Sequence, residues 1–244
     1  MLGTIRLAVL VIIAVIAASD NAMAQKCEIG NRECVLEKIE TLSAEIDRES
    51  WRDQTYRELA KTKAFDGDLD GALTVIDKIQ NPDTKALTIR GIGMAVADLK
   101  WPKEQYDVAF EKLRVKAEQI EHPPSYAIAL TYIAMAQAFA GDNEGAWATA
   151  ADMENDALRH KAYGETAEIQ AERGDFIAAK TSISRIDSLS FRNKAYAIVS
   201  KILADGGHLQ QALDAAMLIE NPYKQASALQ YVLDTQKPRE VKRQ

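Results

Sequence analysis

A spacing of 33 residues recurs along this 244-residue chain, and it constrains the fold more than any other feature. A large hydrophobic residue followed by an acid or an amide marks each occurrence. Successive occurrences lie 33, 41, 33, 33 and 33 residues apart, and they begin at Ile46, Ile79, Ile120, Met153, Ile186 and Ile219. Repetition at a fixed spacing is the signature of proteins built from stacked copies of one structural unit. We therefore expect a repeat architecture.

Each unit is predicted to consist of two helices joined by a turn. Residues 125–140 have hydrophobic side chains at helical spacing. Gly141 then ends this helix, because glycine adopts the left-handed conformation at low cost, and Asp142 caps the next helix. One helix pair cannot bury its hydrophobic face alone, so the pairs must stack. The fold class expected is all-α, a superhelix of about five to six helix–turn–helix repeats.

Small residues are expected where the two helices of a unit meet. Ala60, Gly93, Ala134 and Ala167 recur in the first helices, and Ala72 and its equivalents Ala146, Ala179 and Ala212 recur in the second. Small side chains on both sides let two helices approach closely.

This pattern resembles the tetratricopeptide repeat family. The resemblance covers roughly residues 35–235, although the family's spacing is 34 residues and the family prefers alanine where isoleucine marks each unit here. The residues that carry it are Tyr56, Tyr163 and Tyr196, the pairs Leu59-Ala60, Ile92-Gly93 and Ile133-Ala134, and the turns Gly141-Asp142 and Gly174-Asp175 with Ala146 and Ala179. The resemblance implies a domain over residues 35–236 whose first helices line a concave groove for a protein or peptide partner.

The resemblance also implies which residues line that groove. They change from basic, through an apolar stretch with two methionines, to mixed charge, which suits an extended peptide with acidic and apolar elements. The alternative is a solvated concave face without a ligand. The implied positions are Gln54, Arg57, Lys61, Arg90, Met94, Thr131, Met135, Lys161, Glu168 and Lys201, together with Leu87, Ile128 and Lys194.

The unit from Ile79 to Ile120 is longer than the others. Trp101-Pro102 replaces the glycine turn, and one hydrophobic stripe continues along a long second helix over residues 103–121. This helix is either an extended packing helix or a projecting contact surface.

The N-terminal residues indicate export. A base at Arg6, a hydrophobic run over residues 7–18 and a small-x-small pattern ending at Ala24 predict a signal peptide over residues 1–24, cut after Ala24. Retention of the run from Leu2 as an anchor is the alternative. We expect a periplasmic or secreted protein in which Cys27 and Cys34 form a disulfide, because neighbouring cysteines pair in oxidising compartments. This bond would tether residues 25–34 to the first helix.

One acidic motif has two mutually exclusive interpretations. Asp66, Asp68, Asp70 and Asp77 have the spacing of ligands in a calcium loop of the EF-hand type. The motif also coincides with the repeat turn, where a capped helix would begin at Leu69. We favour the capped turn, since aspartate is a poorer ligand than glutamate at the last position.

The remaining residues indicate binding rather than catalysis. His122, His160 and His208 lie in different units and are expected in loops or at the surface, and no nucleophile motif or phosphate-binding loop occurs. A net charge of -6 disfavours nucleic acid. The basic tail, residues 237–244, is expected to be disordered, so membrane contact would be at most peripheral.

We therefore expect no enzyme activity, no cofactor and no metal. The expected function is a protein–protein interaction module, acting as an adaptor, scaffold or assembly factor. The alternative is a permanently bound structural or accessory subunit of an envelope complex, including one that responds to calcium.

Overall fold

The computed structural model describes residues 27–236, so the predicted signal peptide (1–24) and the predicted basic tail (237–244) lie outside the described residues. Within that range the protein is all-α, as predicted, with twelve helices and no β-strand. The helices are α1 (Arg32–Ala44), α2 (Glu49–Phe65), α3 (Leu69–Ile76), α4 (Pro82–Ala97), α5 (Lys103–Glu118), α6 (Pro123–Ala140), α7 (Asn143–Ala151), α8 (Asp156–Glu172), α9 (Phe176–Ser184), α10 (Leu189–Asp205), α11 (Leu209–Met217) and α12 (Pro222–Gln236).

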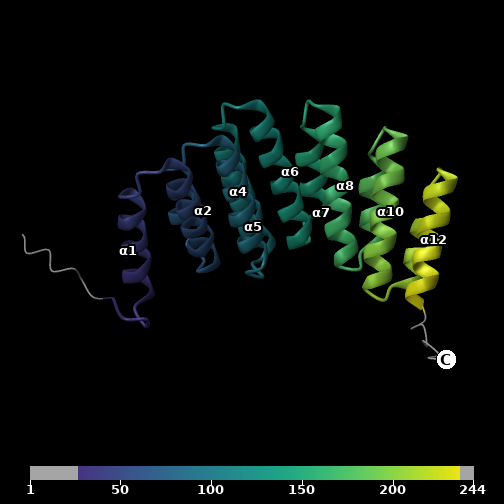
Figure 1. Ribbon diagram of the computed structural model, residues 1–244, viewed down its shortest axis with the longest axis horizontal. Helices are drawn as coiled ribbons and strands as arrows, with labels where there is room; N and C mark the ends of the chain where they lie inside the picture. The colour runs from purple at the N-terminus through teal and green to yellow at the C-terminus, as the bar shows by residue number, and fades with distance from the viewer. Residues whose placement is uncertain (1–26, 237–244) are drawn as a thin grey trace, which may run out of the picture.

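The helices are arranged in one row with α1 at one end and α12 at the other (Figure 1). Helices α2, α4, α6, α8 and α10 have 16 to 18 residues, and each contacts the next helix of this long set. The helix that follows each of them contacts both its long predecessor and the next long helix. The core is consequently continuous along the row rather than gathered around one centre.

Glycine turns separate most long helices from the short helices that follow them, as predicted. The backbone is left-handed at Gly67, Gly141, Gly174 and Gly207, where φ is 82°, 93°, 74° and 80°. Aspartate follows in three of these turns, and its side chain accepts a hydrogen bond from a backbone N–H three residues further on. These N-caps are Asp68, Asp142 and Asp175, and their bonds to Gly71, Gly145 and Ala178 are 2.9, 3.0 and 3.0 Å long.

Lys100 occupies the same position in the long unit, and it adopts the same left-handed conformation without a glycine. Its φ of 53° is the only positive φ at a non-glycine residue within 27–236. A side chain in this region costs about 1–2 kcal/mol, because Cβ approaches the following carbonyl oxygen. The turn geometry is therefore retained at some cost to stability.

Helix α5 is an extended packing helix. It has 16 residues, against eight or nine in α3, α7, α9 and α11, and it ends three residues before the predicted boundary. Its first turn is anchored by Tyr106, whose hydroxyl donates to the carbonyl of Ala97 (3.0 Å) and accepts from the N–H of Trp101 (3.1 Å). Near its other end, Lys116 pairs with Asp77 at 2.6 Å.

The close contact between the two helices of this unit is preserved because a larger residue on α5 is matched by a smaller one on α4. Leu113 stands where the other units have alanine, and Gly93 stands opposite on α4. A Cβ on Gly93 would lie 3.6 Å from Cδ1 of Leu113 and 2.9 Å from Cβ of Ala136. A larger residue at either position would force the helices apart.

Three buried polar side chains, one each on α2, α8 and α10, bind the backbone ahead of the next long helix. Asp53 accepts from the N–H groups of Gln80 (3.1 Å) and Asn81 (2.8 Å), and Asn193 makes the equivalent bonds 140 residues later. His160 accepts from the N–H of Asp187 at 3.3 Å. The expectation of a surface or loop histidine is thus wrong for His160, which is only 7% exposed.

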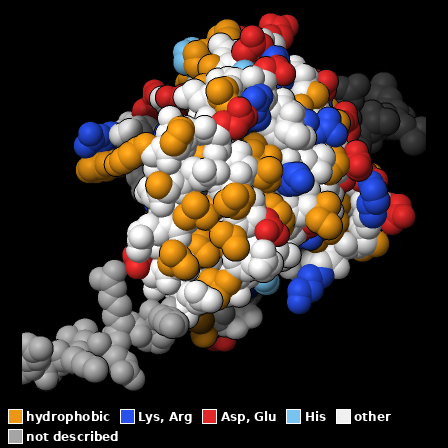
Figure 2. All heavy atoms as spheres, turned by 90° about the vertical axis from the view of Figure 1, so that its right-hand side faces the viewer, with side chains coloured by type: hydrophobic (Ala, Val, Ile, Leu, Met, Phe, Trp, Pro, Cys, Tyr) orange, Lys and Arg blue, Asp and Glu red, His pale blue; other side chains and the backbone are white. Residues whose placement is uncertain are grey.

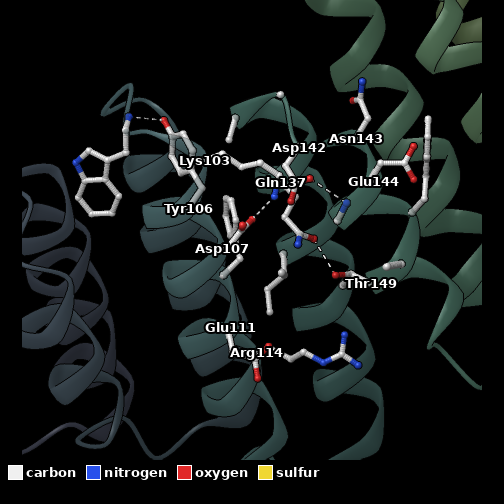
Figure 3. A pocket seen from close by; sticks show the side chains of 18 residues that line it. Lys103, Tyr106, Asp107, Glu111, Arg114, Gln137, Asp142, Asn143, Glu144 and Thr149 are labelled. Carbon is white, nitrogen blue, oxygen red and sulfur yellow. Dashed lines mark hydrogen bonds and ion pairs between the residues drawn. The ribbon is translucent and has the colours of Figure 1, made fainter.

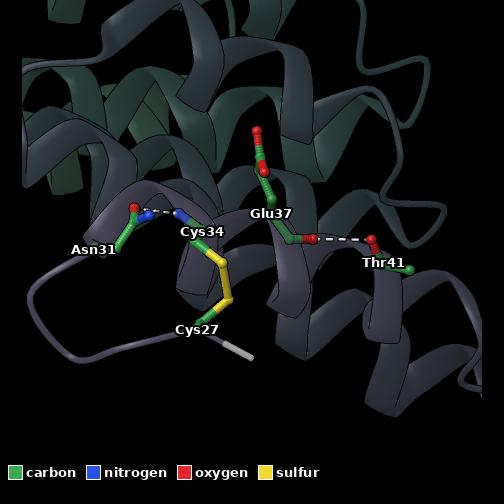
Figure 4. The surroundings of a disulfide bond; sticks show 5 residues. All are labelled: Cys27, Asn31, Cys34, Glu37 and Thr41. Carbon is green, nitrogen blue, oxygen red and sulfur yellow. Dashed lines mark hydrogen bonds between the residues drawn. A yellow bond between two sulfur atoms is a disulfide. The ribbon is translucent and has the colours of Figure 1, made fainter. Parts of the chain in front are cut away.

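The predicted disulfide between Cys27 and Cys34 is present (Figure 4). Cys34 lies in the first turn of α1, and its N–H donates to the side chain of Asn31 at 3.1 Å. The bond therefore fastens the segment that precedes α1 to the helix itself.

Candidate functional site

A hollow of about 350 Å³ lies between α2 and α4, and it contains five of the residues predicted to bind a partner. Arg57 and Lys61 come from α2, whereas Leu87, Arg90 and Met94 come from α4. The other lining residues are Glu58 and Gly91. Below we call this set the α2–α4 hollow.

Its charges are only partly compensated within the protein. Both Nε and Nη2 of Arg57 donate to the carboxylate of Glu58, at 3.0 and 2.7 Å. Lys61 and Arg90 form no ion pair with any described residue, and their charged groups instead lie over the rings of Phe65 (5.7 Å) and Tyr132 (5.3 Å). Two cationic groups in the hollow thus remain available to an incoming carboxylate.

Two further hollows lie between long helices nearer the C-terminus, and they contain the predicted Lys161, Glu168 and Lys201. The α8–α10 hollow, of about 140 Å³, includes Lys161, Glu168 and Lys194. The α10–α12 hollow, of about 250 Å³, is lined by Lys194, Lys201 and Lys224 together with apolar and hydroxyl side chains. The predicted binding residues therefore fall into two groups at different places along the row.

Burial raises the pKa of the Glu168 carboxyl, and the neighbouring Glu165 acts in the same direction. Lys194 on the facing helix opposes them by stabilising the charged form. Glu168 on α8 and Lys194 on α10 are thus in electrostatic contact.

Thr131 does not lie on an accessible face, and its prediction as a binding residue is wrong. It is 3% exposed, and its hydroxyl donates to the carbonyl of Ala127 at 3.1 Å. Arg57 and Arg90 occupy the same position of their helices, but their long side chains extend to solvent. A threonine can bond its own helix backbone, so it tolerates burial here.

Three other predicted residues lie outside these hollows. Ile128 is partly buried against the core. Gln54 is exposed on α2 but lines none of them. Met135 is partly buried against the cluster of Ala134, Ala138, Ala146 and Ile169. The two methionines therefore do not line a common hollow.

A further hollow, larger than the three described above, was not predicted as a site. About 790 Å³ opens between α5, α6 and α7, with Trp101, Trp147 and buried aromatic rings among its lining (Figure 3). The only signal in the sequence was the eight-residue extension that lengthens α5. Below we call this the α5–α7 cleft.

Most polar side chains of the α5–α7 cleft already have hydrogen-bond or ion-pair partners within the protein. Lys103 pairs with Asp107 at 2.6 Å, and Gln137 accepts from the hydroxyl of Thr149 at 2.8 Å. Asp142 caps α7, as described above. The lining residues include no histidine, cysteine or serine.

The acidic motif is a capped turn, as favoured from the sequence. Helix α3 begins at Leu69 with Asp68 as its N-cap, so the backbone that a calcium loop would need after Gly71 is helical. The three other carboxylates each have a basic partner at 2.6 Å: Asp66 binds Arg32, Asp70 binds Lys112 and Asp77 binds Lys116. No cluster of three or more metal-binding side chains occurs between residues 27 and 236.

None of the described helices is both long and apolar enough to cross a membrane. Comparisons of the chain with protein-family models, with curated proteins and with solved structures each found no match.

Proposed function

We propose that the protein is an interaction module with a tetratricopeptide-like superhelix, in which five helix–turn–helix units lie between α1 and α12. Its ligand is an extended protein segment that carries carboxylates and hydrophobic side chains. One observation supports this most strongly: Lys61 and Arg90 share the α2–α4 hollow with Leu87 and Met94, and neither base pairs with a carboxylate among residues 27–236.

The composition of the hollow determines the chemistry of the ligand. Bringing Arg57, Lys61 and Arg90 together places like charges side by side with a single carboxylate, Glu58, among them. A carboxylate from a partner relieves this repulsion, and arginine binds it through two parallel hydrogen bonds. Leu87 is 36% exposed and Met94 partly so, and both offer apolar contact beside the charges. An acidic segment with an adjacent hydrophobic residue fits both features.

The proposed location is the periplasm or the extracellular space. The predicted signal peptide and the disulfide between Cys27 and Cys34 support it, because such bonds persist in oxidising compartments and are rare in the cytosol.

The partner can be isolated by affinity purification followed by mass spectrometry, and its affinity then measured for charge-reversal variants. The double variant Arg57→Glu with Arg90→Glu should bind about tenfold more weakly at low salt, and the loss should shrink as salt rises. Lys180→Glu, on the exposed surface of α9, is the matched control and should bind normally. Met94→Ser should weaken binding with little dependence on salt.

The α5–α7 cleft is the competing site in the same experiment. Glu111 and Glu144 line it and form no ion pair with any residue of the described range. If the partner binds the arginine variants normally but is lost by Glu111→Lys with Glu144→Lys, the α2–α4 hollow is not the binding site. Circular dichroism of each variant separates these outcomes from unfolding.

A further inference from the structure

The two ends of the helix row differ in polarity. At the first end, α1 exposes mainly polar side chains, Glu33, Glu37, Lys38 and Thr41, together with Leu42, which is 46% exposed. The other end, formed by α11 and α12, gathers hydrophobic side chains near the centre of its face (Figure 2). A row of packed helices needs a polar or covered surface at each end, since any hydrophobic face left open is in contact with water.

The hydrophobic surface at this second end is a hollow of about 300 Å³, which we call the α11–α12 face. Leu233 is 61% exposed and Leu213 is 37% exposed, whereas the residues at the position of Leu233 in the preceding long helices are buried. None of the lining residues is charged; they are Leu209, Gln210, Leu213, Leu229, Val232, Leu233 and Gln236.

Leu233 shows that another short helix cannot cover this face as it does elsewhere in the row. In the five preceding long helices the same position holds a small, fully packed residue that lets the following helix approach closely. These residues are Ala60, Gly93, Ala134, Ala167 and Ser200. A leucine side chain fills the space that the approaching helix would need, so whatever covers α12 must bind with a different geometry.

Residues 237–244 are an unsuitable cover. Their sequence, KPREVKRQ, has five charged side chains and only Pro238 and Val241 as apolar ones. Burying such a segment against leucines would remove charges from water without partners.

We propose that the α11–α12 face binds a second copy of this chain, related by a two-fold axis. In such an interface each residue faces the same surface on the other copy, so a charged face would repel itself. The α11–α12 face avoids this because its leucines and valine are apolar. Gln210 and Gln236 can donate and accept hydrogen bonds at once, so each can pair with a glutamine of the other copy. This inference does not depend on the α2–α4 hollow or on its ligand.

Sedimentation velocity of the purified protein with its disulfide intact tests the proposal. The average mass should rise from monomer toward dimer between about 1 and 100 µM, the range of a small interface. Leu213→Glu with Leu233→Glu should weaken self-association about tenfold or more, since it places four carboxylates in the interface. Ile177→Glu, at an 81% exposed isoleucine on α9, is the matched control and should dimerise normally.

Cross-linking identifies the face directly. Within 27–236 both cysteines are already bonded to each other, so Leu233→Cys adds a single thiol. With diamide as oxidant, two such thiols should join into a disulfide between copies, whereas Ile177→Cys should remain monomeric on a non-reducing gel. A monomer at all concentrations overturns the proposal. So does a dimer that the leucine variants leave intact, because its interface would lie elsewhere.

Discussion

Replacing Asp53 tests how successive units are joined. Asp53 is 1% exposed, and Oδ2 accepts hydrogen bonds from the N–H groups of Gln80 and Asn81 just before α4. Its other oxygen, Oδ1, is buried without a partner. The side chain therefore holds the loop that sets the position of the next long helix, while half of its carboxylate is unsatisfied.

The cost of Asp53→Ala follows from these two bonds. A hydrogen bond to a charged group contributes about 1.5–3 kcal/mol to stability. Gln80 and Asn81 are exposed, so water can take over part of the lost bonding. We expect Asp53→Ala to lower the free energy of unfolding by about 2–4 kcal/mol. Asp53→Asn should cost less than about 1 kcal/mol, because an amide oxygen can accept both bonds, as Asn193 does in its own unit.

Urea unfolding of the three proteins, followed by circular dichroism, gives both differences. The reasoning is refuted if Asp53→Ala unfolds within about 0.5 kcal/mol of the unmodified protein, the range of an ordinary surface change. It is also refuted if Asp53→Asn is as damaging as Asp53→Ala, because the charge rather than the accepted bonds would then be the stabilising feature.

Four further experiments, three of them substitutions, test other parts of the structure. Lys100→Gly should stabilise the protein by about 0.5–1 kcal/mol in thermal unfolding, since relief of the left-handed strain exceeds the entropy that glycine adds to the unfolded chain. Tyr163→Ala should cost about 3–5 kcal/mol in urea unfolding, because its side chain is 4% exposed. Thiol labelling in denaturant without reductant should modify neither Cys27 nor Cys34. The pKa of Glu168 is raised in the folded state, so ionisation of this carboxyl destabilises the protein above the folded pKa. Glu168→Gln should therefore stabilise the protein at pH 7. In a pH series of melting temperatures, this gain in stability should vanish below the unfolded pKa of about 4.3.

The helices and their turns could be predicted because their signals are local. A glycine at a fixed distance from an isoleucine specifies where a helix ends, and the aspartate after Gly67, Gly141 or Gly174 specifies where the next begins. The exception is informative. Lys100 adopts the turn conformation without glycine, which indicates that packing on both sides of the turn determines the backbone more strongly than the residue itself.

The candidate site could be predicted only in part, because exposure depends on neighbouring helices. Arg57, Lys61 and Arg90 meet as expected, since long charged side chains reach solvent wherever their helix positions them. Thr131 has the same helical position but a short side chain, and the adjacent helices bury it. His160 became a buried hydrogen-bond acceptor for a backbone 27 residues away, a contact that no local pattern encodes.

The two proposals together determine which partners should bind the dimer more tightly than the monomer. Long helices pack about 8–10 Å apart, so the α2–α4 hollow lies about 40–50 Å from a two-fold axis at α12, and the two hollows of a dimer lie about 80–100 Å apart. An extended chain covers about 3.3 Å per residue, so one segment needs about 25–30 residues to reach both.

A short acidic peptide should therefore bind the monomeric Leu213→Glu, Leu233→Glu variant as tightly as the dimer. A partner presenting two acidic segments at that separation, or many on one surface, should bind the dimer more tightly, because its second contact becomes intramolecular. Equal binding of such a multivalent partner to both forms would show that the dimer does not present its hollows to a common surface.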